Sequence, residues 1–477
     1  MSTVVGLDVG TTGVKALAVS ASGEVLGRAE EEYPLSIPRA GWAEQDPEDW
    51  WRAAEAALAA LGADPVGIGL SGQMHGLVAL DEEERVIRPA ILWNDQRTAA
   101  ECVEIEKRLG LERLIALTGN RALTGFTAPK LLWLRRHEPG AYGRIAHVLL
   151  PKDYVRLRLT GERSTDVADA SGTLLFNVAA RRWSEEMLAA LEIPPAWLPP
   201  ALESAEQAGR TEEDVPVAAG AGDQAAGALG VGVDRPGPLS VVLGTSGVVF
   251  AALPGYAADP RARVHAFCHA APGEWHAMGV MLSAAGSLRW FRSAFAPEAS
   301  YEALVGEAAG WEPGAEGLTF LPYLHGERTP HADPGARGSF VGLTMRHDRG
   351  ALVRAVLEGV AYGLRDCLEL LRELGVRPEV GRVSGGGARS DLWLRIVASV
   401  LGIPLERTAV EEGAAYGAAL LGGVAGGVFA DVGEAVAACV RVRDVVEPEP
   451  EWRNAYDAGY ERFRALYPAL RPLEADA

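Results

Sequence analysis

The 477-residue chain is poor in cysteine and in basic side chains. Its four cysteines, Cys102, Cys268, Cys367 and Cys439, lie far apart in the sequence and form no Cys-x-x-Cys pair. This spacing argues against a disulfide framework or a zinc site and indicates free thiols in a reducing compartment. Lys and Arg together number 45 against 64 Asp and Glu, so the net charge of −19 disfavours nucleic acid or an anionic membrane as the main ligand.

Long uncharged apolar runs are also missing. No such run reaches the length of a membrane span, and Asp8 interrupts the first apolar stretch, which therefore does not resemble a secretion signal. We expect a cytoplasmic protein on these grounds. Hydrophobic residues make up 48% of the chain and charged residues 23%, which is typical of globular proteins, and the length predicts at least two domains.

The first residues show a strand-turn-strand pattern with a polar corner. An apolar run leads into Gly10-Thr11-Thr12-Gly13, and a second apolar run follows it. The glycines permit a tight turn, and its exposed amides together with two hydroxyls make an anion nest. Asp8 stands two residues before the turn, where a buried carboxylate needs a cation or another partner. The pattern fits a Mg²⁺-nucleotide site and equally an ordinary hairpin with a polar tip.

A second copy of the pattern favours the nucleotide interpretation. Gly244-Thr245-Ser246-Gly247 again lies between β-branched runs. When Gly10 is aligned with Gly244, Val242 takes the place of Asp8, so the turn is duplicated but the carboxylate is not. Two such turns predict two related domains that hold one polyphosphate from opposite sides.

Two loops after apolar strands carry candidate ligand contacts. Met74 and His75 lie in a glycine-flanked loop, and loops at the carboxyl ends of strands bind ligands in α/β proteins. We therefore expect both residues to contact a small polar ligand. Trp93, Asn94 and Asp95 follow the next strand. Trp93 and Asn94 could line a sugar site and form hydrogen bonds with the sugar, whereas Asp95 could simply cap the following helix.

A further carboxylate, Asp223, follows a glycine-rich strand end and opens a helix rich in alanine and glycine. A helix N-cap is the commonest use of aspartate at such a position. However, Asp223 directly precedes the second turn in the sequence and is flanked by glycines, so it is also placed as a general base between sugar and phosphate. The polar run 165–172 is predicted to be a loop with a structural role.

The second half repeats the strand-and-loop plan. Gly385-Gly386-Gly387-Ala388 follows a strand, and its glycines let a flat heterocycle lie against the backbone. A segment of the second half is similar in sequence to the Asp223 helix but has Gly413 in place of the carboxylate. Both carboxylates, Asp8 and Asp223, are therefore confined to the first half. We therefore predict a sugar-binding and catalytic domain at 1–235 and a nucleotide-binding domain at 236–477.

These motifs together resemble the superfamily of sugar kinases, actin and heat-shock chaperones, and most closely the FGGY carbohydrate kinases, within them the branch that phosphorylates xylulose. The resemblance covers nearly the whole chain. It is carried by Ser71–Gly76, Ile91–Asp95, Gly222–Gly227, Gly326–His331 and Gly385–Arg389. Glycerol kinases carry an Asn-Gln-Arg-type sequence where this chain has Gly-Gln-Met-His, which argues against glycerol. The implied fold is α/β, with two related ribonuclease-H-like domains of the actin-like ATPase superfamily and an interdomain cleft.

The resemblance implies ATP-dependent phosphorylation of D-xylulose at its C5 hydroxyl, with ATP and Mg²⁺ as cofactors. By this resemblance Asp223 accepts the hydroxyl proton, and Asp8, with Asp223 beside it, holds Mg²⁺. The implied sugar contacts are Met74, His75, Trp93, Asn94, Asp95 and Gln224. Relatives often carry asparagine at the position of Gln224. The implied phosphate contacts are Gly10, Thr11, Thr12, Gly13, Gly244, Thr245, Ser246 and Gly247, and the implied adenosine contacts are Gly386, Gly387 and Ala388.

Other activities could use the same motifs. A kinase for another ketose or polyol, such as ribulose, would need all of them. An actin-like or chaperone-like ATPase would hydrolyse ATP without sugar, but the His75 loop and Asp223 argue against it. A sugar-sensing regulator is disfavoured because both carboxylates are present and no basic DNA-binding segment is appended. The expected partners are a small sugar and ATP, without nucleic acid or membrane, and a homodimer is a further expectation.

Overall fold

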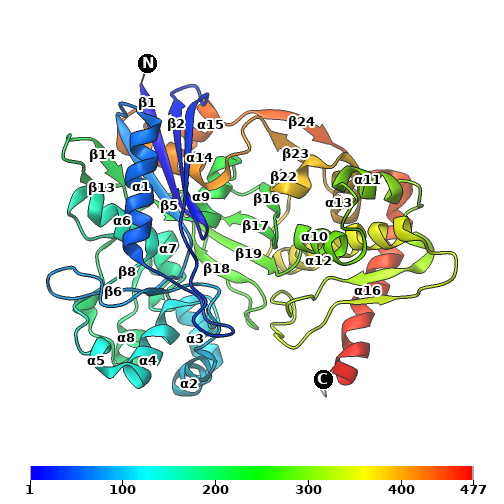
Figure 1. Cartoon of the computed structure of the whole chain (residues 1–477), viewed down its shortest axis with the longest axis horizontal. Helices are drawn as coiled ribbons and strands as arrows, with labels where there is room; N and C mark the ends of the chain where they lie inside the picture. The colour runs from blue at the N-terminus through cyan, green and yellow to red at the C-terminus, as the bar shows by residue number, and fades with distance from the viewer. Residues whose placement is uncertain (1, 475–477) are drawn as a thin grey trace.

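The computed structural model of the protein describes residues 2–474. Its main strands form two 7-stranded sheets, which lie side by side. In Figure 1 the first sheet lies on the left and the second extends from the centre to the right. Each half of the chain builds one sheet, as the duplicated turns predict.

The first sheet has the strand order β13-β14-β5-β1-β2-β3, and β15 also pairs with β5. Its first three strands in sequence form the predicted antiparallel meander, while β5 runs parallel to β1. The strands are β1 (Thr3–Val9), β2 (Gly13–Ser20), β3 (Val25–Glu32), β5 (Gly67–Gly72), β13 (Gln207–Arg210), β14 (Pro216–Ala218) and β15 (Ala221–Gly222).

The second sheet repeats this arrangement with the order β18-β19-β17-β16-β22-β23-β24. Here β16, β17 and β19 form the antiparallel meander, and β22 runs parallel to β16 as β5 does to β1. The strands are β16 (Pro238–Leu243), β17 (Gly247–Leu253), β18 (His265–Cys268), β19 (Trp275–Met281), β22 (Val380–Ser384), β23 (Leu405–Thr408) and β24 (Val442–Val446).

Helices cover both sheets. On the first sheet α1 and α6 pack together over one face, and the second sheet is covered by the long α12. The main helices are α1 (Pro47–Leu61), α2 (Ala99–Leu109), α3 (Leu111–Thr118), α4 (Thr127–His137), α6 (Pro151–Thr160), α7 (Val167–Ser171), α8 (Glu185–Leu191), α9 (Asp223–Gly230), α10 (Ala285–Phe295), α11 (Tyr301–Ala308), α12 (Arg349–Glu373), α13 (Asp391–Leu401), α14 (Gly413–Ala425), α15 (Val432–Cys439) and α16 (Arg453–Glu474). Within residues 2–474, none of the helices has the length and apolar character needed to cross a membrane.

Short segments connect these layers. They include the four-residue α5 (Pro139–Tyr142) and paired strands at β4 (Glu44–Gln45), β6 (Val78–Leu80), β7 (Ala90–Ile91), β8 (His147–Leu149), β9 (Thr165–Asp166), β10 (Phe176–Asn177), β11 (Arg182–Trp183), β12 (Ala201–Leu202), β20 (Thr319–Leu321) and β21 (Ser339–Val341). The run 165–172 is therefore not the predicted loop, because it contains β9 and the short helix α7.

Helix α14 joins the two halves, since it comes from the second half but packs on the first sheet against β1, β5 and α9. Glycines make this contact. A Cβ on Gly6 or Gly69 would come within 1.9 Å of an α14 carbonyl oxygen, and one on Gly417 within 1.8 Å of the Ala226 carbonyl of α9. We call Gly6, Gly67, Gly69 and Gly417 the glycine seam. The predicted domain boundary at residue 235 stays a prediction, because α14 comes after this boundary in the sequence but packs on the first sheet.

Candidate active site

Three parallel strands of the first sheet end at one edge and bring the predicted residues together. Asp8 of β1 lies in register with Ser71 of β5, and Gly72 lies in register with Gly222 of β15. Asp223 follows as the first residue of α9. Both predicted carboxylates thus stand at the carboxyl ends of parallel strands, where α/β sheets bind ligands.

The carboxylates of Asp8 and Asp223 influence each other. Burial raises the pKa of Asp8, although the Ser71 hydroxyl, which donates to Asp8 Oδ1 at 2.6 Å, and the charge of Lys15 oppose this rise. Burial, and then the charge of Asp8, raises the pKa of Asp223 to about 7. Gln224 opposes that shift and donates from Nε2 to Asp223 Oδ1 at 3.3 Å. Asp223 can therefore exchange a proton near neutral pH, as a general base requires.

Two neighbouring carboxylates of this kind fit a divalent cation. Mg²⁺ commonly binds to proteins through one or two carboxylates, with phosphate oxygens and water completing its shell. Residues 2–474 contain no cluster of three His, Cys, Asp or Glu side chains able to hold a metal ion. Asp8 and Asp223 fit the part of the one or two protein carboxylates in such a shell.

The first hairpin turn presents free amides. The Gly10 amide donates to the Gly13 carbonyl at 3.0 Å and closes the turn. Within residues 2–474 the amides of Thr11 and Thr12 have no protein acceptor. Trp93 donates from Nε1 to Thr11 Oγ1 at 3.0 Å, which places this predicted sugar contact directly on the turn. The arrangement is an anion nest walled by an indole ring.

Side chains hold the carbonyl groups of this turn. Gln73 donates from Nε2 to the Gly10 carbonyl at 3.2 Å, and the Tyr33 hydroxyl donates to the same oxygen. Gln45 donates from Nε2 to the Thr11 carbonyl at 2.7 Å. The Gln73 amide also donates to Gln45 Oε1 at 2.9 Å, so the two glutamines act as one support. Side chains thus occupy the Gly10 and Thr11 carbonyls of the turn.

The His75 backbone has a left-handed conformation, with φ of 69°, and is pinned from helix α4. Its carbonyl accepts a hydrogen bond from Thr127 Oγ1 at 3.1 Å and another from Lys130 Nζ at 2.8 Å. The imidazole packs edge-on against Phe126, with 4.8 Å between ring centroids, and lies over Gly172, where a Cβ would come within 2.1 Å of Nδ1. A strained residue fixed by this many contacts is typical of a functional site.

The remaining predicted sugar contacts differ in accessibility. Burial and nearby cations, Lys130 first, keep the pKa of His75 well below 6.5, so its ring is neutral. Met74 is buried and packs on Gly222, where a Cβ would come within 2.6 Å of its Cγ, so it lies between His75 and Asp223. The side-chain oxygen of Asn94 is buried without a hydrogen-bond partner among residues 2–474, and a ligand hydroxyl could satisfy it.

Asp95 has a different environment from its neighbours. It is completely buried, and its Oδ2 accepts hydrogen bonds from the Ala43 amide and from an Arg97 NH2 group, both at 2.7 Å. Its Oδ1 accepts from the Arg97 amide at 2.9 Å. Both oxygens are thus occupied, and this arrangement favours a structural role over the predicted sugar contact.

The second hairpin, Gly244-Thr245-Ser246-Gly247, joins β16 to β17 at the facing edge of the second sheet. Backbone amides at the start of α10 and directly before it hold its carbonyls. Ala284 donates to Thr245 O and Ala285 to Gly244 O, each at 2.8 Å, and Gly286 donates to Thr245 O at 3.1 Å. The second hairpin differs from the first in register, since Leu243 pairs with Gly247 whereas Val9 pairs with Val14, and it also has a different support.

The glycine loop after β22 lies against this hairpin. A Cβ on Gly385 would come within 2.7 Å of the Leu243 carbonyl oxygen. Gly386 and Ala388 line a cavity of about 140 Å³ beside it, together with Val231, Val383, Ser384, Gly385, Arg389, Arg407, Thr408, Val410, Glu411 and Gly413. Gly387 does not line the cavity, because it faces inwards and a Cβ there would lie 2.9 Å from Leu243 Cβ. A heterocycle would therefore contact two of the three predicted adenosine residues.

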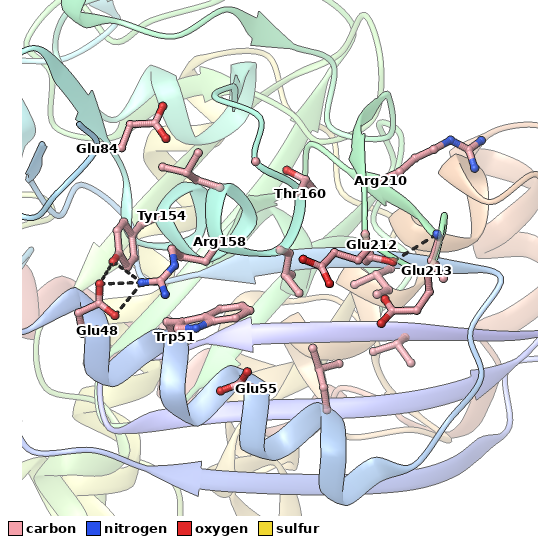
Figure 2. A pocket seen from close by; sticks show the side chains of 18 of the residues that line it. Glu48, Trp51, Glu55, Glu84, Tyr154, Arg158, Thr160, Arg210, Glu212 and Glu213 are labelled. Carbon is pink, nitrogen blue, oxygen red and sulfur yellow. Dashed lines mark hydrogen bonds and ion pairs between the residues drawn. The ribbon is translucent and has the colours of Figure 1, made fainter. Parts of the chain in front are cut away.

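A larger hollow, of about 1450 Å³, lies on the outer face of the first sheet. Figure 2 shows Glu48 at one end of it, bound to Tyr154 and Arg158, and Glu212 and Glu213 at the other. Arg158 donates to Glu48 Oε1 at 2.6 Å. Neither hairpin and neither site carboxylate lines this hollow, so it is separate from the candidate active site.

Sequence reasoning missed the residues that support the site. Tyr33 was not singled out, because an isolated polar residue carries no pattern. Lys130 offered one signal: it lies in an otherwise apolar stretch of α4, where a buried cation needs a partner. Phe126 and Gly172 act only through contacts with His75, and such contacts depend on the folded chain.

Comparison with known proteins covers nearly the whole chain. Residues 3–230 match the N-terminal domain of the FGGY family of carbohydrate kinases, and residues 239–426 match its C-terminal domain. The xylulose kinase of Escherichia coli K12 is 43% identical over 486 residues, covering 99% of this chain and 100% of that protein. The xylulose kinase of Klebsiella pneumoniae is 45% identical over 436 residues, covering 88% and 89%.

A solved structure agrees with these sequence comparisons. The crystal structure titled a xyloylose kinase from Brucella ovis superimposes with a TM-score of 0.94 at 44% identity, covering 99% of this chain and 100% of that one. The predicted α/β fold, with two related domains of the actin-like ATPase type, is confirmed by this similarity and by the duplicated sheets.

Proposed function

Because the chain belongs to the FGGY family of carbohydrate kinases and is an ATP-dependent sugar kinase, we propose that it phosphorylates D-xylulose on the C5 hydroxyl. The observation that carries the proposal is the position of Asp223, which stands beside the Met74–His75 loop and next to Asp8 with a pKa of about 7. The names of the full-length relatives support xylulose as the sugar. A kinase for another ketose, such as ribulose, is the alternative that would need the same machinery.

In the proposed reaction Asp223 accepts the proton of the C5 hydroxyl as the hydroxyl oxygen attacks the γ-phosphorus in line, the bond from that phosphorus to the β–γ bridging oxygen breaks, and ADP leaves. Phosphoryl transfer depends mainly on positioning and on neutralising charge. The free amides of Thr11 and Thr12, and the second hairpin opposite, hold the phosphates. Mg²⁺, when bound, neutralises phosphate charge, and Asp8 is the residue that would hold it.

The remaining contacts of the proposal concern the sugar and the base of the nucleotide. Met74 and His75 position the ketose, with Trp93, Asn94 and Gln224 around it. Gly386 and Ala388 hold the adenosine. Water competes with the sugar as an acceptor, so we infer that the cleft closes over the sugar before transfer. A homodimer and a cytoplasmic location stay predictions.

The test is ADP release by the purified protein with Mg²⁺-ATP, with and without D-xylulose. D-ribulose, L-ribulose, L-xylulose, glycerol and gluconate serve as alternative acceptors, and the Asp223→Ala variant serves as the control. We expect strong stimulation by D-xylulose that the variant lacks, with a pentulose phosphate carrying its phosphate on C5 in the phosphorus NMR spectrum. If another sugar stimulates ADP release instead, that sugar takes the place of D-xylulose as the proposed substrate. ADP release that no sugar changes would contradict the proposal.

A further inference from the structure

Helix α7 has five residues and lies where the two halves of the molecule meet. It packs against β15, which leads into Asp223, and against β18 of the second sheet (Figure 1). The Oγ of Ser171, its last residue, accepts a hydrogen bond from the Cys268 amide of β18 at 3.0 Å. So short a helix is marginal by itself, because its few backbone bonds do not offset the cost of nucleation. Its side-chain contacts must therefore fix its position.

The end of α7 supports the ring of His75, a predicted sugar contact. Gly172 follows the helix, and a Cβ there would come within 2.1 Å of His75 Nδ1 and 2.2 Å of Cε1. The carbonyl of His75 is held separately, by Thr127 and Lys130 of α4. The backbone of His75 is thus fixed from α4, whereas its ring rests on the end of α7.

A buried lysine of α6 fixes the start and the middle of α7. Asp166 caps the helix, because its Oδ1 accepts hydrogen bonds from the amides of Ala168 at 2.8 Å and Asp169 at 3.0 Å. Its other oxygen, Oδ2, lies 2.6 Å from Lys152 Nζ, and Asp169 Oδ2 lies 3.4 Å from the same nitrogen. Lys152 therefore holds two points of the helix at once.

Two further residues of α6 complete this ion cluster. Asp153 Oδ1 lies 2.6 Å from Lys152 Nζ and 3.0 Å from Arg156 NH2. None of the five charged side chains has exposed surface: Lys152, Asp153, Arg156, Asp166 and Asp169. Charges withdrawn from water are costly unless their partners are well placed, so the cluster tolerates little displacement of α7 relative to α6.

Lys152 also contacts the strand that leads into the His75 loop. A Cβ on Gly72, the last residue of β5, would come within 3.2 Å of Lys152 Cβ. The loop that carries His75 begins directly after Gly72. The stem of Lys152 therefore lies against the strand before this loop, while its ammonium group holds the helix on which the ring of His75 rests.

We propose that Lys152 positions His75 for the ketose through α7, by its ion pair with the helix cap Asp166. Because its side chain has no exposed surface, Lys152 acts as a positioning residue. This inference rests on the proposed function, since it takes His75 as a contact of the ketose. It makes KM for the sugar depend on a buried ion pair that lies outside the pocket.

The test is Asp166→Asn. Asparagine caps a helix as well as aspartate does, so the capping hydrogen bonds stay. The cluster becomes charge-balanced, since two cations then face two carboxylates, and the change removes the ion pair between the cap and Lys152. We expect KM for D-xylulose to rise roughly fivefold, an ordinary size for a lost pairwise interaction, with KM for ATP unchanged. Asp431→Asn, at the exposed cap of α15, is the matched control and should leave both values unchanged.

A double-mutant cycle with Gly172→Ala separates positioning from a general structural effect. Both substitutions displace the same imidazole, so their effects should not multiply. The double variant should again show roughly a fivefold rise in KM for the sugar, instead of the roughly 25-fold rise of independent sites. Lys152→Met would leave three carboxylates facing one cation and is expected to fold poorly, so Asp166→Asn is the variant that decides.

Histidine NMR reports the position of the ring without any substrate. The chain has nine histidines, so the Cε1–H signal of His75 can be assigned from its loss in His75→Gln. We expect Asp166→Asn and Gly172→Ala to shift this signal and Asp431→Asn to leave it in place. An unshifted signal, an unchanged KM for the sugar, effects that multiply, or an equal rise in KM for ATP would overturn the role of Lys152. If the wild type phosphorylates no ketose, the proposed function fails, whereas the His75 signal still decides the positioning.

Discussion

The two Gly-Thr hairpins have related sequences but different registers, since Val9 pairs with Val14 in the first and Leu243 with Gly247 in the second, and they are supported by different groups. The carbonyls of the first are held by side chains, Gln45 on Thr11 and Gln73 and Tyr33 on Gly10. The carbonyls of the second are held by backbone amides at the start of α10. A support made of side chains can be altered by a single substitution, whereas a support made of backbone is independent of side-chain identity.

The same contrast applies to the carboxylates. Asp8 of β1 has Val242 as its counterpart in β16, and Asp223, the first residue of α9, has Gly413, the first residue of α14. Gly413 lines the cavity beside the glycine loop, so its lack of a side chain leaves room for a ligand. Both carboxylates thus lie in the first half, and valine and glycine stand at their counterparts in the second. The predictions below test that division.

The largest effect is expected at Asp223. Asp223→Asn removes the proton acceptor but keeps the side-chain shape, and general bases contribute roughly 10²–10⁴-fold to rate. We expect kcat to fall by about that factor while KM for the sugar changes only a few-fold. Steady-state kinetics measure both. Glu185→Gln, an exposed acidic residue at the first position of α8, is the matched control and should leave kcat unchanged.

Asp8→Asn should lower activity and also move its pH dependence. Burial, and then the charge of Asp8, raise the pKa of Asp223 to about 7, and Asp223 must be deprotonated to accept a proton. Activity of the wild type should therefore rise with pH through about 7. Without the Asp8 charge the pKa of Asp223 falls, so the acid limb of the pH–activity profile should move to lower pH. The variant should also need a higher Mg²⁺ concentration for activity. An unchanged acid limb together with an unchanged Mg²⁺ requirement would contradict both roles of Asp8.

Gln45→Leu should weaken nucleotide binding through the first hairpin alone. It removes the 2.7 Å hydrogen bond to the Thr11 carbonyl and leaves Gln73 and Trp50 without their shared acceptor. Losing a buried hydrogen bond costs about 1–3 kcal/mol, so KM for ATP should rise roughly tenfold. If KM for ATP stays at the wild-type value, the turn keeps its shape without its side-chain support, and the contrast between the hairpins is not functional.

Gly172→Ala should affect the sugar and spare the nucleotide. Its Cβ would lie 2.1 Å from His75 Nδ1, so the imidazole must move. We expect KM for the sugar to rise roughly fivefold, the size of an ordinary packing change, with KM for ATP unchanged. Gly140→Ala, where a Cβ meets no atom within 4 Å, is the matched control. A normal KM in Gly172→Ala would mean that the orientation of His75 does not matter for binding.

The sequence predicts the sheet meanders, both hairpins and the two carboxylates because each depends on local patterns. Strand-turn-strand periodicity needs only neighbouring residues, and internal repetition confirms it within one chain. The capping of α1 by Asp46, which accepts a hydrogen bond from the Glu48 amide, follows from the same local chemistry. The predicted roles of the site residues in binding and catalysis stay predictions.

What the sequence could not predict depends on contacts between distant segments. Asp95 resembles a sugar ligand or a cap until Arg97, which stacks on Trp42 with 3.7 Å to the ring centroid, folds over it. The run 165–172 reads as a polar loop, but Lys152 bonds to Asp166 at 2.6 Å in the interior and stabilises a short helix there. The polar composition of the run 165–172 alone suggests that it is exposed. Only its buried partner, Lys152, shows that it lies in the interior.

The glycine seam between α14 and the first sheet has a consequence for variation among related sequences. Gly6, Gly67, Gly69 and Gly417 are each in backbone contact closer than a methyl group allows. No neighbouring side chain can shrink to compensate a larger residue there, because carbonyl oxygens form the opposing surface. A saturation-mutagenesis map should therefore show a stripe of intolerance where α14 meets β1, β5 and α9, and this stripe would record an architectural constraint.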